Sequence, residues 1–208
     1  HPARAQEERM NELMTAIAEH LTIVAISMVF AAIIGIALGV FSYWKPRVGR
    51  YIIGIAEIIQ TIPSLALLAL LMIIFGLGDL TMGVALVLYA LLPIIRNTYT
   101  SLTELPPYII DAARGIGMSR QQRLVKVEIH LSIPMIFGGL KVALVNSLSI
   151  AVMGVLIGSG GLGYIIYRGI QQRNMDRILL GAIPVVVIAL IFDWGMGKAE
   201  KRLQKHAR

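Results

Sequence analysis

Residues 21–41 read LTIVAISMVFAAIIGIALGVF and contain no charged side chain. A helix of about 20 apolar residues is long enough to cross the ~30 Å hydrocarbon core of a bilayer. A core helix of a soluble protein would keep a polar face, and this segment offers none. The apolar region of a cleavable signal peptide would be shorter, roughly 7–15 residues. The segment is therefore predicted to be a transmembrane helix.

The rest of the chain has the same apolar character. Apolar residues make up 57% of the sequence and charged residues 15%, whereas soluble domains carry roughly 25% charged residues. We predict an all-α, polytopic membrane protein with about five transmembrane helices in a single domain, residues 13–203. The spans are expected at about residues 20–43, 51–76, 80–103, 131–157 and 178–197.

Short segments flank this domain, and prolines interrupt it. Residues 1–12 lack an initiator Met and are interpreted as an N-terminal extension left from cloning, with Met10 as the expected native start. Residues 204–208 are interpreted as a basic cytoplasmic tail. Pro63, in QTIPS, removes a backbone donor and disfavours helix at the preceding residue, so a kink or two half-helices are expected there. Pro93 and Pro184 are expected to bend their helices as well.

Lys and Arg residues are distributed unevenly about the five spans. Five crossings place the termini on opposite sides of the membrane, and the short cytoplasmic loops collect Lys and Arg. With the N-terminus outside and the C-terminus in the cytoplasm, the 19 Lys and Arg leave only these outside: Arg4, Arg9, Arg168, Arg173 and Arg177. The net charge of +7 therefore indicates membrane topology. Nucleic-acid binding would need basic and aromatic residues together on a soluble face.

The cytoplasmic loop at residues 104–130, between the third and fourth spans, is too long and too polar for a simple connection. Its first part, YIIDAARGIGMS, has an apolar stripe broken by Gly115 and Gly117. The stretch RQQRLVKVEI is expected to form a second, basic amphipathic helix. Such a hairpin would lie on anionic lipid or dock in the groove of a partner. The residues alone leave both possibilities open.

Part of this loop resembles a known family. Asp111-Ala112-Ala113 is followed after three residues by Gly117, and Ile133-Pro134 comes later, as in the cytoplasmic EAA loop of permease subunits of ATP-binding-cassette importers. In that family the loop forms a coupling helix that inserts into a cleft of the ATPase subunit. The resemblance implies that ATP hydrolysis is coupled to transport through Asp111, Ala112, Ala113, Gly115 and Gly117. Asp111 replaces the usual Glu and keeps its charge, and His130 stands where many members have a first Pro.

The resemblance covers about residues 13–203 and becomes narrower in 58–71, 92–102, 115–118 and 158–170. These stretches are similar to permeases for osmoprotectants such as glycine betaine, carnitine and choline. The resemblance implies a multi-pass protein of the bacterial plasma membrane. It also implies three kinds of partner: two ATPase subunits that bind ATP and Mg, a second permease copy or paralogue, and an extracellular substrate-binding protein.

Two alternatives stay open at this point. One is an importer permease for methionine or another small solute, because the cytoplasmic loop is shared more widely than the substrate. The other is a stand-alone channel or secondary transporter. A secondary transporter would show inverted repeats and ion-coordinating residues at the midplane, and the sequence shows neither clearly.

Glycines recur at spacings with structural meaning. GSGGLG at residues 158–163 matches G-x-G-x-x-G, but it follows a membrane span and no βαβ unit is present. We interpret it as a loop near an external gate, formed by Gly158, Ser159, Gly160, Gly161 and Gly163, within a segment, 158–177, that contributes to binding-protein docking. An ordinary flexible connection is the alternative. The pairs Gly35/Gly39 and Gly154/Gly158 have the spacing of close helix contacts, within the chain or across a dimer.

Four charged residues fall inside or near the predicted spans: Glu57, Arg96, Lys141 and Asp193. At about 1.5 Å rise per residue, Glu57 lies roughly 9 Å and Arg96 roughly 10 Å from the inner ends of their spans. Charges at this depth are costly unless they are paired. We therefore predict a charge network in the cytoplasmic half of the path. The alternative is that Arg96 and Lys141 extend to the inner headgroups while Asp193 ends its helix.

The sequence contains no motif for catalysis or cofactor binding in a suitable context. It contains no G-x-x-x-x-G-K-[ST] phosphate loop, so ATP and Mg are expected to bind a partner rather than this chain. The four histidines share no metal-ligand spacing, and no Ser, His and Asp grouping suggests hydrolysis. The chain is predicted to be a transport subunit without catalytic residues, metal or cofactor of its own.

Overall fold

The computed structural model describes residues 2–206, with side chains for residues 7–205. The described chain is helical and contains no β-strand. Its elements are α1 (Pro2–Trp44), α2 (Pro46–Thr61), α3 (Ser64–Phe75), α4 (Asp79–Thr103), α5 (Pro107–Gly115), α6 (Arg120–Arg123), the π-helical segment η1 (Leu124–Glu128), α7 (Ile129–Ala151), the 3-10 segment η2 (Val152–Ile157), α8 (Leu162–Gln171) and α9 (Met175–His206).

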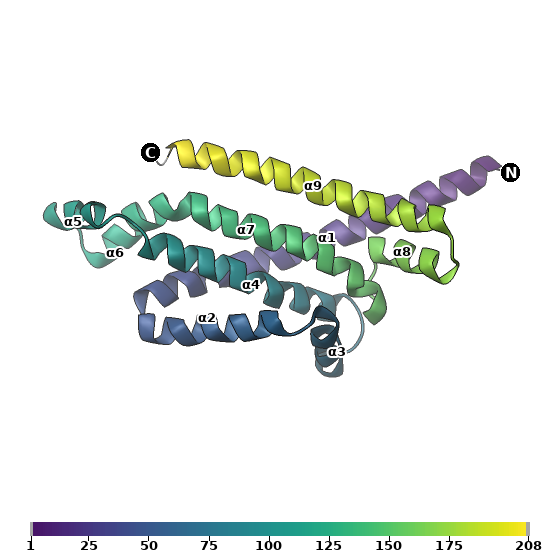
Figure 1. The fold of residues 1–208 in the computed structure, drawn as a ribbon, viewed down its shortest axis with the longest axis horizontal. Coiled ribbons are helices and arrows are strands. Elements are labelled where there is room, and N and C mark those ends of the chain that lie inside the picture. The colour runs from purple at the N-terminus through teal and green to yellow at the C-terminus, as the bar shows by residue number, and fades with distance from the viewer. Residues whose placement is uncertain (1, 207–208) are drawn as a thin grey trace.

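The long helices run side by side, with α4 at the centre (Figure 1). Helix α1 packs against α4, α7 also packs against α4, and α9 lies against α7. Of the four long apolar helices, α4 is the most buried, with 56% of its most apolar 18 residues buried, and α9 is the least buried, with 6%. Helices α5 and α6 lie at one end of the molecule, the α5 end, and α8 lies at the other, the α8 end. Helix α1 starts at the α8 end and α9 finishes at the α5 end, as an odd number of crossings requires.

The second predicted span is broken where the proline was expected to act. Within the described residues, four helices are long and apolar enough to cross a membrane, and there are five spans if the bent pair α2 and α3 counts as one. These two helices meet at 104°. Ile62 has φ −69° and ψ 126°, the extended conformation favoured before Pro63. The predictions of an all-α fold with about five spans and of a break at QTIPS are confirmed.

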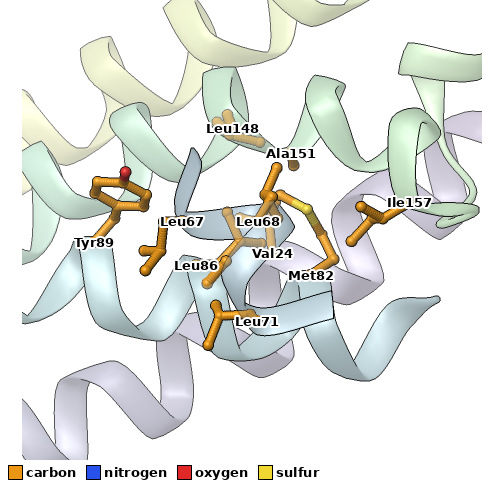
Figure 2. Close-up of a cluster of buried hydrophobic side chains, with 11 residues drawn as sticks. Val24, Leu67, Leu68, Leu71, Met82, Leu86, Tyr89, Leu148, Ala151 and Ile157 are labelled. Carbon is orange, nitrogen blue, oxygen red and sulfur yellow. The ribbon is translucent and has the colours of Figure 1, made fainter. Parts of the chain in front are cut away.

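The main hydrophobic core forms where α3 turns back toward α1, α4 and α7 (Figure 2). Leu68, Met82 and Leu86 are completely buried there. Figure 2 shows the side chains of these three residues meeting those of Val24 and Ala151. The bend at Pro63 therefore places α3 where its apolar side chains complete the core.

Two glycines allow α1 to approach α4 closely. A Cβ atom at Gly39 would lie 2.5 Å from the Cβ of Thr98, and one at Gly35 would lie 2.8 Å from a methyl of Ile94. Small residues at this spacing let helix backbones come together in membranes. The Gly35/Gly39 contact is thus made within the chain, which settles the alternative of a dimer contact. A Cβ atom at Gly154 would lie 3.0 Å from the Cβ of Ser159 and 3.4 Å from the Met82 side chain of α4, whereas one at Gly158 would meet nothing within 4 Å, so the second pair does not act together as a helix contact.

The N-terminal segment is helical and continuous with the first span. Helix α1 runs from Pro2 to Trp44 without a break, so residues 2–12 extend the helix beyond its apolar part. Glu12 lies 3.6 Å from Arg168 of α8 and 3.2 Å from Arg177 of α9. These ion pairs hold a charged segment that the apolar pattern did not include. Residue 1 lies outside the described residues.

Three further helices differ from the extents that the sequence predicted for them. The stretch RQQRLVKVEI is not a separate helix, because one helix continues from Arg120 to Ile157. Helix α9 continues to His206, so the predicted tail of residues 204–208 begins inside a helix, and residues 207–208 lie outside the described part. Helix α8 starts at Leu162, inside the predicted loop 158–163, and forms much of the segment 158–177. These helices are longer than their apolar segments because their backbone hydrogen bonds continue into polar residues.

The close contact between α1 and α4 gives a stability prediction. We expect Gly39→Ala to lower the free energy of unfolding in detergent micelles by about 1–3 kcal/mol, because the added methyl has no space. Gly54→Ala is the matched control, since a Cβ there would meet nothing within 4 Å. Helix propensity alone favours Ala over Gly by roughly 0.5–1 kcal/mol, so the control should be slightly stabilised. Equal effects of the two substitutions would contradict the close contact.

Candidate functional site

Helix α5 contains Asp111-Ala112-Ala113 and projects from one end of the bundle (Figure 1). Pro107 occupies the first helical position, where a missing backbone N–H costs nothing. The Asp111 side chain is 70% exposed and lies 3.5 Å from the Arg114 guanidinium. Ala113 faces inward and is buried. Asp111, Ala112 and Arg114 are therefore exposed, whereas Ala113 anchors the opposite face of α5.

One face of α5 is uncovered. Tyr108 and Ile116 are 72% and 75% exposed, and Ala112 and Gly115 lie between them. Residues three and four apart share a helix face. A Cβ atom at Gly115 would meet nothing within 4 Å. Two small residues flanked by two large apolar ones form a shallow, open surface that no other described part of the chain covers.

Gly117 ends α5 in a fixed geometry. Its φ of +81° is in the left-handed region, which glycine adopts without steric cost. The N–H of Met118 donates to the Ala113 carbonyl and the N–H of Gly117 donates to the Arg114 carbonyl, which is the Schellman pattern. Ser119 then caps α6 through a reciprocal pair of hydrogen bonds with Gln122. The turn between α5 and α6 is thus fixed by hydrogen bonds on both sides.

The turn is attached to the end of α1. The Arg120 guanidinium donates to the Trp44 carbonyl at 3.1 Å and lies 5.5 Å from the centre of the Trp44 ring. Three residues further on, Arg123 donates to the Glu128 carboxylate at 2.5 Å, and Glu128 is only 1% exposed. Sequence reasoning missed this pair. Residues five apart lie about 140° apart on an α-helix, and only a π-helical turn aligns them.

The predicted intramembrane charges form two separate ion pairs. Arg96 of α4 pairs with Glu57 of α2, and Lys141 of α7 lies 3.0 Å from Asp193 of α9. No ion pair between the two sets occurs among the described residues. Each acid pairs with the base on the helix beside it. The predicted four-membered network is therefore two pairs on opposite sides of the bundle.

The glycine-rich segment at the α8 end is held by hydrogen bonds. The Ser159 hydroxyl donates to the Asp79 carboxylate at 2.7 Å, and the Gly161 N–H donates to the Glu19 carboxylate at 2.9 Å. A Cβ atom at Gly160 would lie 2.3 Å from the same carboxylate, so a larger residue there would displace the Glu19 side chain. Gly158 ends η2 with φ +74°, and Gly163 lies in α8. The loop interpretation holds for residues 158–161, which are fixed against α1 and α4.

A cavity of about 910 Å³ lies beside this loop, between α1 and α4. Its walls are mainly apolar and include Ile23, Phe30 and Val84. Glu19 and Asp79 are its acidic residues. Among the side chains described, no group of three or more His, Cys, Asp or Glu could hold a metal ion.

Residues 31–205 match a family described as the binding-protein-dependent transport system inner membrane component. The chain belongs to this family. It is therefore a membrane component of a transport system that works with a binding protein, and a transport subunit rather than an enzyme acting alone.

Relatives of this permease family share substantial sequence with the chain. The carnitine transport permease protein OpuCD of Listeria monocytogenes is 43% identical over 185 residues, which are 88% of this chain and 83% of that protein. The glycine betaine/carnitine/choline transport system permease protein OpuCD of Bacillus subtilis is 41% identical over 88% of this chain and 81% of its own. The osmoprotectant import permease protein OsmW of Salmonella typhimurium is 39% identical over 85% of this chain and 84% of its own.

Solved structures share the fold. An inward-facing structure of the MetNI methionine ABC transporter has a chain with a TM-score of 0.81 and 25% identity, covering 97% of this chain and 99% of that one. A chain from an amino acid ABC transporter has a TM-score of 0.77 and 18% identity, covering 95% and 97%. The fold is that of an ABC transporter permease.

The Glu57–Arg96 pair in this permease predicts a non-additive response. Glu57→Gln leaves Arg96 without its partner, which costs more than removing both charges. We expect the double variant Glu57→Gln/Arg96→Gln to recover roughly 0.5–2 kcal/mol of the summed losses in free energy of unfolding. The control combines Glu57→Gln with Lys141→Gln, from different pairs, and should be additive. Additivity in both combinations would contradict a stabilising Glu57–Arg96 interaction.

Proposed function

We propose that this chain is the permease subunit of an ATP-driven importer for osmoprotectants such as glycine betaine, carnitine or choline. The observation that carries the proposal is the 43% identity, over 88% of the chain, to a permease named for carnitine transport. A methionine permease is the weaker alternative, because the methionine transporter chain of the same fold is 25% identical.

The cavity at the α8 end has chemistry that suits such solutes. A quaternary ammonium carries a positive charge inside an apolar shell. The carboxylates of Glu19 and Asp79 attract a cation, and the Phe30 ring and aliphatic walls accept methyl groups. These features favour a small solute that carries a quaternary ammonium, either a cation such as choline or a zwitterion such as glycine betaine, over a purely anionic solute.

The direct test is uptake into proteoliposomes that contain the permease with its ATPase and that receive its binding protein outside. We expect ATP-dependent accumulation of radiolabelled carnitine, glycine betaine or choline. Unlabelled methionine should not compete. Uptake of methionine without uptake of any quaternary ammonium would refute the proposed substrate class.

The partners follow from the exposed surfaces. We propose that the open face of α5 docks in a cleft of the ATPase, with two ATPase subunits that bind ATP and Mg and a second permease copy or paralogue completing the complex. The loop 158–161 and helix α8 lie at the opposite end and are proposed to meet the extracellular binding protein and form the external gate. Closure of the ATPases would then push α5, and the helices joined to it through the turn at Gly117 would tilt.

The proposed orientation places the α8 end outside the cell and the C-terminus in the cytoplasm. The chain has no cysteine, so single cysteines report sidedness without background. We expect Gln172→Cys, after α8, to react with a membrane-impermeant thiol reagent added outside. Gln121→Cys, exposed on α6, is the matched control and should react only after the membrane is opened. The reverse pattern would overturn the orientation.

Gly117 gives a test of coupling through α5. Proline at 117 cannot adopt φ +81° and has no N–H to donate to Arg114, so Gly117→Pro should lower uptake by roughly tenfold or more while insertion is unchanged. Gly117→Asn is the control, because Asn tolerates the left-handed conformation. Uptake by the proline variant at the wild-type rate, with ATP hydrolysis still coupled, would show that α5 is not the coupling element.

A further inference from the structure

The junction between α5 and α7 contains the most completely buried ion pair of the described chain. The Arg123 and Glu128 side chains are 11% and 1% exposed, whereas every other ion pair that we find among the described side chains includes a partner at least 30% exposed. Burying two charges is costly, and replacement by apolar residues is often neutral or stabilising. A contribution to folding stability is therefore a weak explanation for the presence of this pair.

The pair spans a π-helical turn. The N–H of Ile129 donates to the Leu124 carbonyl, five residues back, and η1 lies between Arg123 and the start of α7. A π-helical turn is an irregular point inside an otherwise continuous helix and is frequent at functional sites. The Arg123–Glu128 contact joins the two sides of this turn. It therefore acts as a side-chain brace across the point where the long helix Arg120–Ile157 is most easily bent.

The same residues are joined to α1. The Tyr43 phenol at the end of α1 lies near the Glu128 carboxylate and interacts with its charge. Its neighbour Trp44 is held by Arg120. A Cβ atom at Gly49 of α2 would also lie 2.6 Å from the Ser42 carbonyl oxygen, so α2 packs closely against the end of α1. The end of α1 is enclosed between α2 and the junction.

We propose that Arg123 and Glu128, with Tyr43, are positioning residues that make α5, α7 and the end of α1 move as one body. Helix α5 touches the rest of the chain mainly through the turn that leads into α6, so a push on α5 reaches the bundle through η1. With the brace in place, the push moves α7 and α1 together. Without it, the π-helical turn bends and absorbs the displacement. This inference rests on the proposed function and adds residues that the Asp111–Gly117 segment does not include.

The test separates mechanical coupling from stability. The double variant Arg123→Met/Glu128→Leu replaces both charges by apolar residues, so no charge is left unpaired. We expect it to bind the ATPase and to melt at or above the wild-type temperature. In proteoliposomes, the ratio of solute taken up to ATP hydrolysed should fall by roughly tenfold, which is about 1.4 kcal/mol of lost coupling. Lys126→Met, exposed on the same turn, should keep the wild-type ratio.

Tyr43→Phe provides a second, isosteric variant that removes one hydroxyl and leaves the ion pair intact. We expect its ratio of uptake to hydrolysis to fall by a smaller factor than that of the double variant, with unchanged melting. A wild-type ratio in both variants would overturn the brace. Absence of ATP-dependent uptake by the wild-type complex would instead refute the proposed function, so the two failures are distinguishable.

Discussion

In the hydrocarbon core of a bilayer, each backbone N–H and C=O must find its partner inside the protein. This constraint explains why the chain is helical and also how its irregular points are tolerated. At the break before Pro63, the Tyr89 hydroxyl donates to the Ile62 carbonyl at 2.5 Å. After α3, the Thr81 hydroxyl donates to the Gly76 carbonyl at 2.6 Å. The Gly78 N–H donates to the Ile157 carbonyl at 2.7 Å. At each of these three points, a group from another part of the chain supplies the missing partner.

The elements that could be predicted are those for which a local sequence pattern and the thickness of the membrane indicate the same structure. Apolar runs of about 20 residues indicated the spans, and Pro63 acts on its own neighbour, so the break could be placed to the residue. Helix ends could not be placed from hydropathy, because a helix ends where backbone hydrogen bonding ends. Residues 2–12 are helical although charged, and Glu12 binds two arginines that are more than 150 residues away in sequence. Such contacts leave no local signal.

The candidate sites, too, were predictable where a feature is local in sequence and unpredictable where it depends on which helices are neighbours. The depth of a residue along a helix could be counted from the sequence, and because charges inside the membrane must be paired, Glu57 and Arg96 could be predicted to belong to one charge network. Which helices lie side by side is not contained in that count, and the four charges form two pairs because α2 lies beside α4 and α9 beside α7. The Arg123–Glu128 pair was not predicted because residues five apart do not face each other on an α-helix and do so only across a π-helical turn. A search for buried charges at i and i+5 near a helix entry would have found it.

Helix α1 connects the two ends of the molecule. In its first half, Glu19 accepts a hydrogen bond from the Gly161 N–H of the glycine loop, and the buried His20 ring donates to the Leu148 carbonyl of α7 at 3.1 Å. At its end, Trp44 holds Arg120 of the α5 junction. About 25 residues separate these contacts, roughly 38 Å of helix at 1.5 Å per residue. Between them, Gly35 and Gly39 hold α1 against α4 with no space for lateral movement. A helix restrained in this way transmits displacement along its axis, so a shift at the α5 end acts directly on the loop at the α8 end.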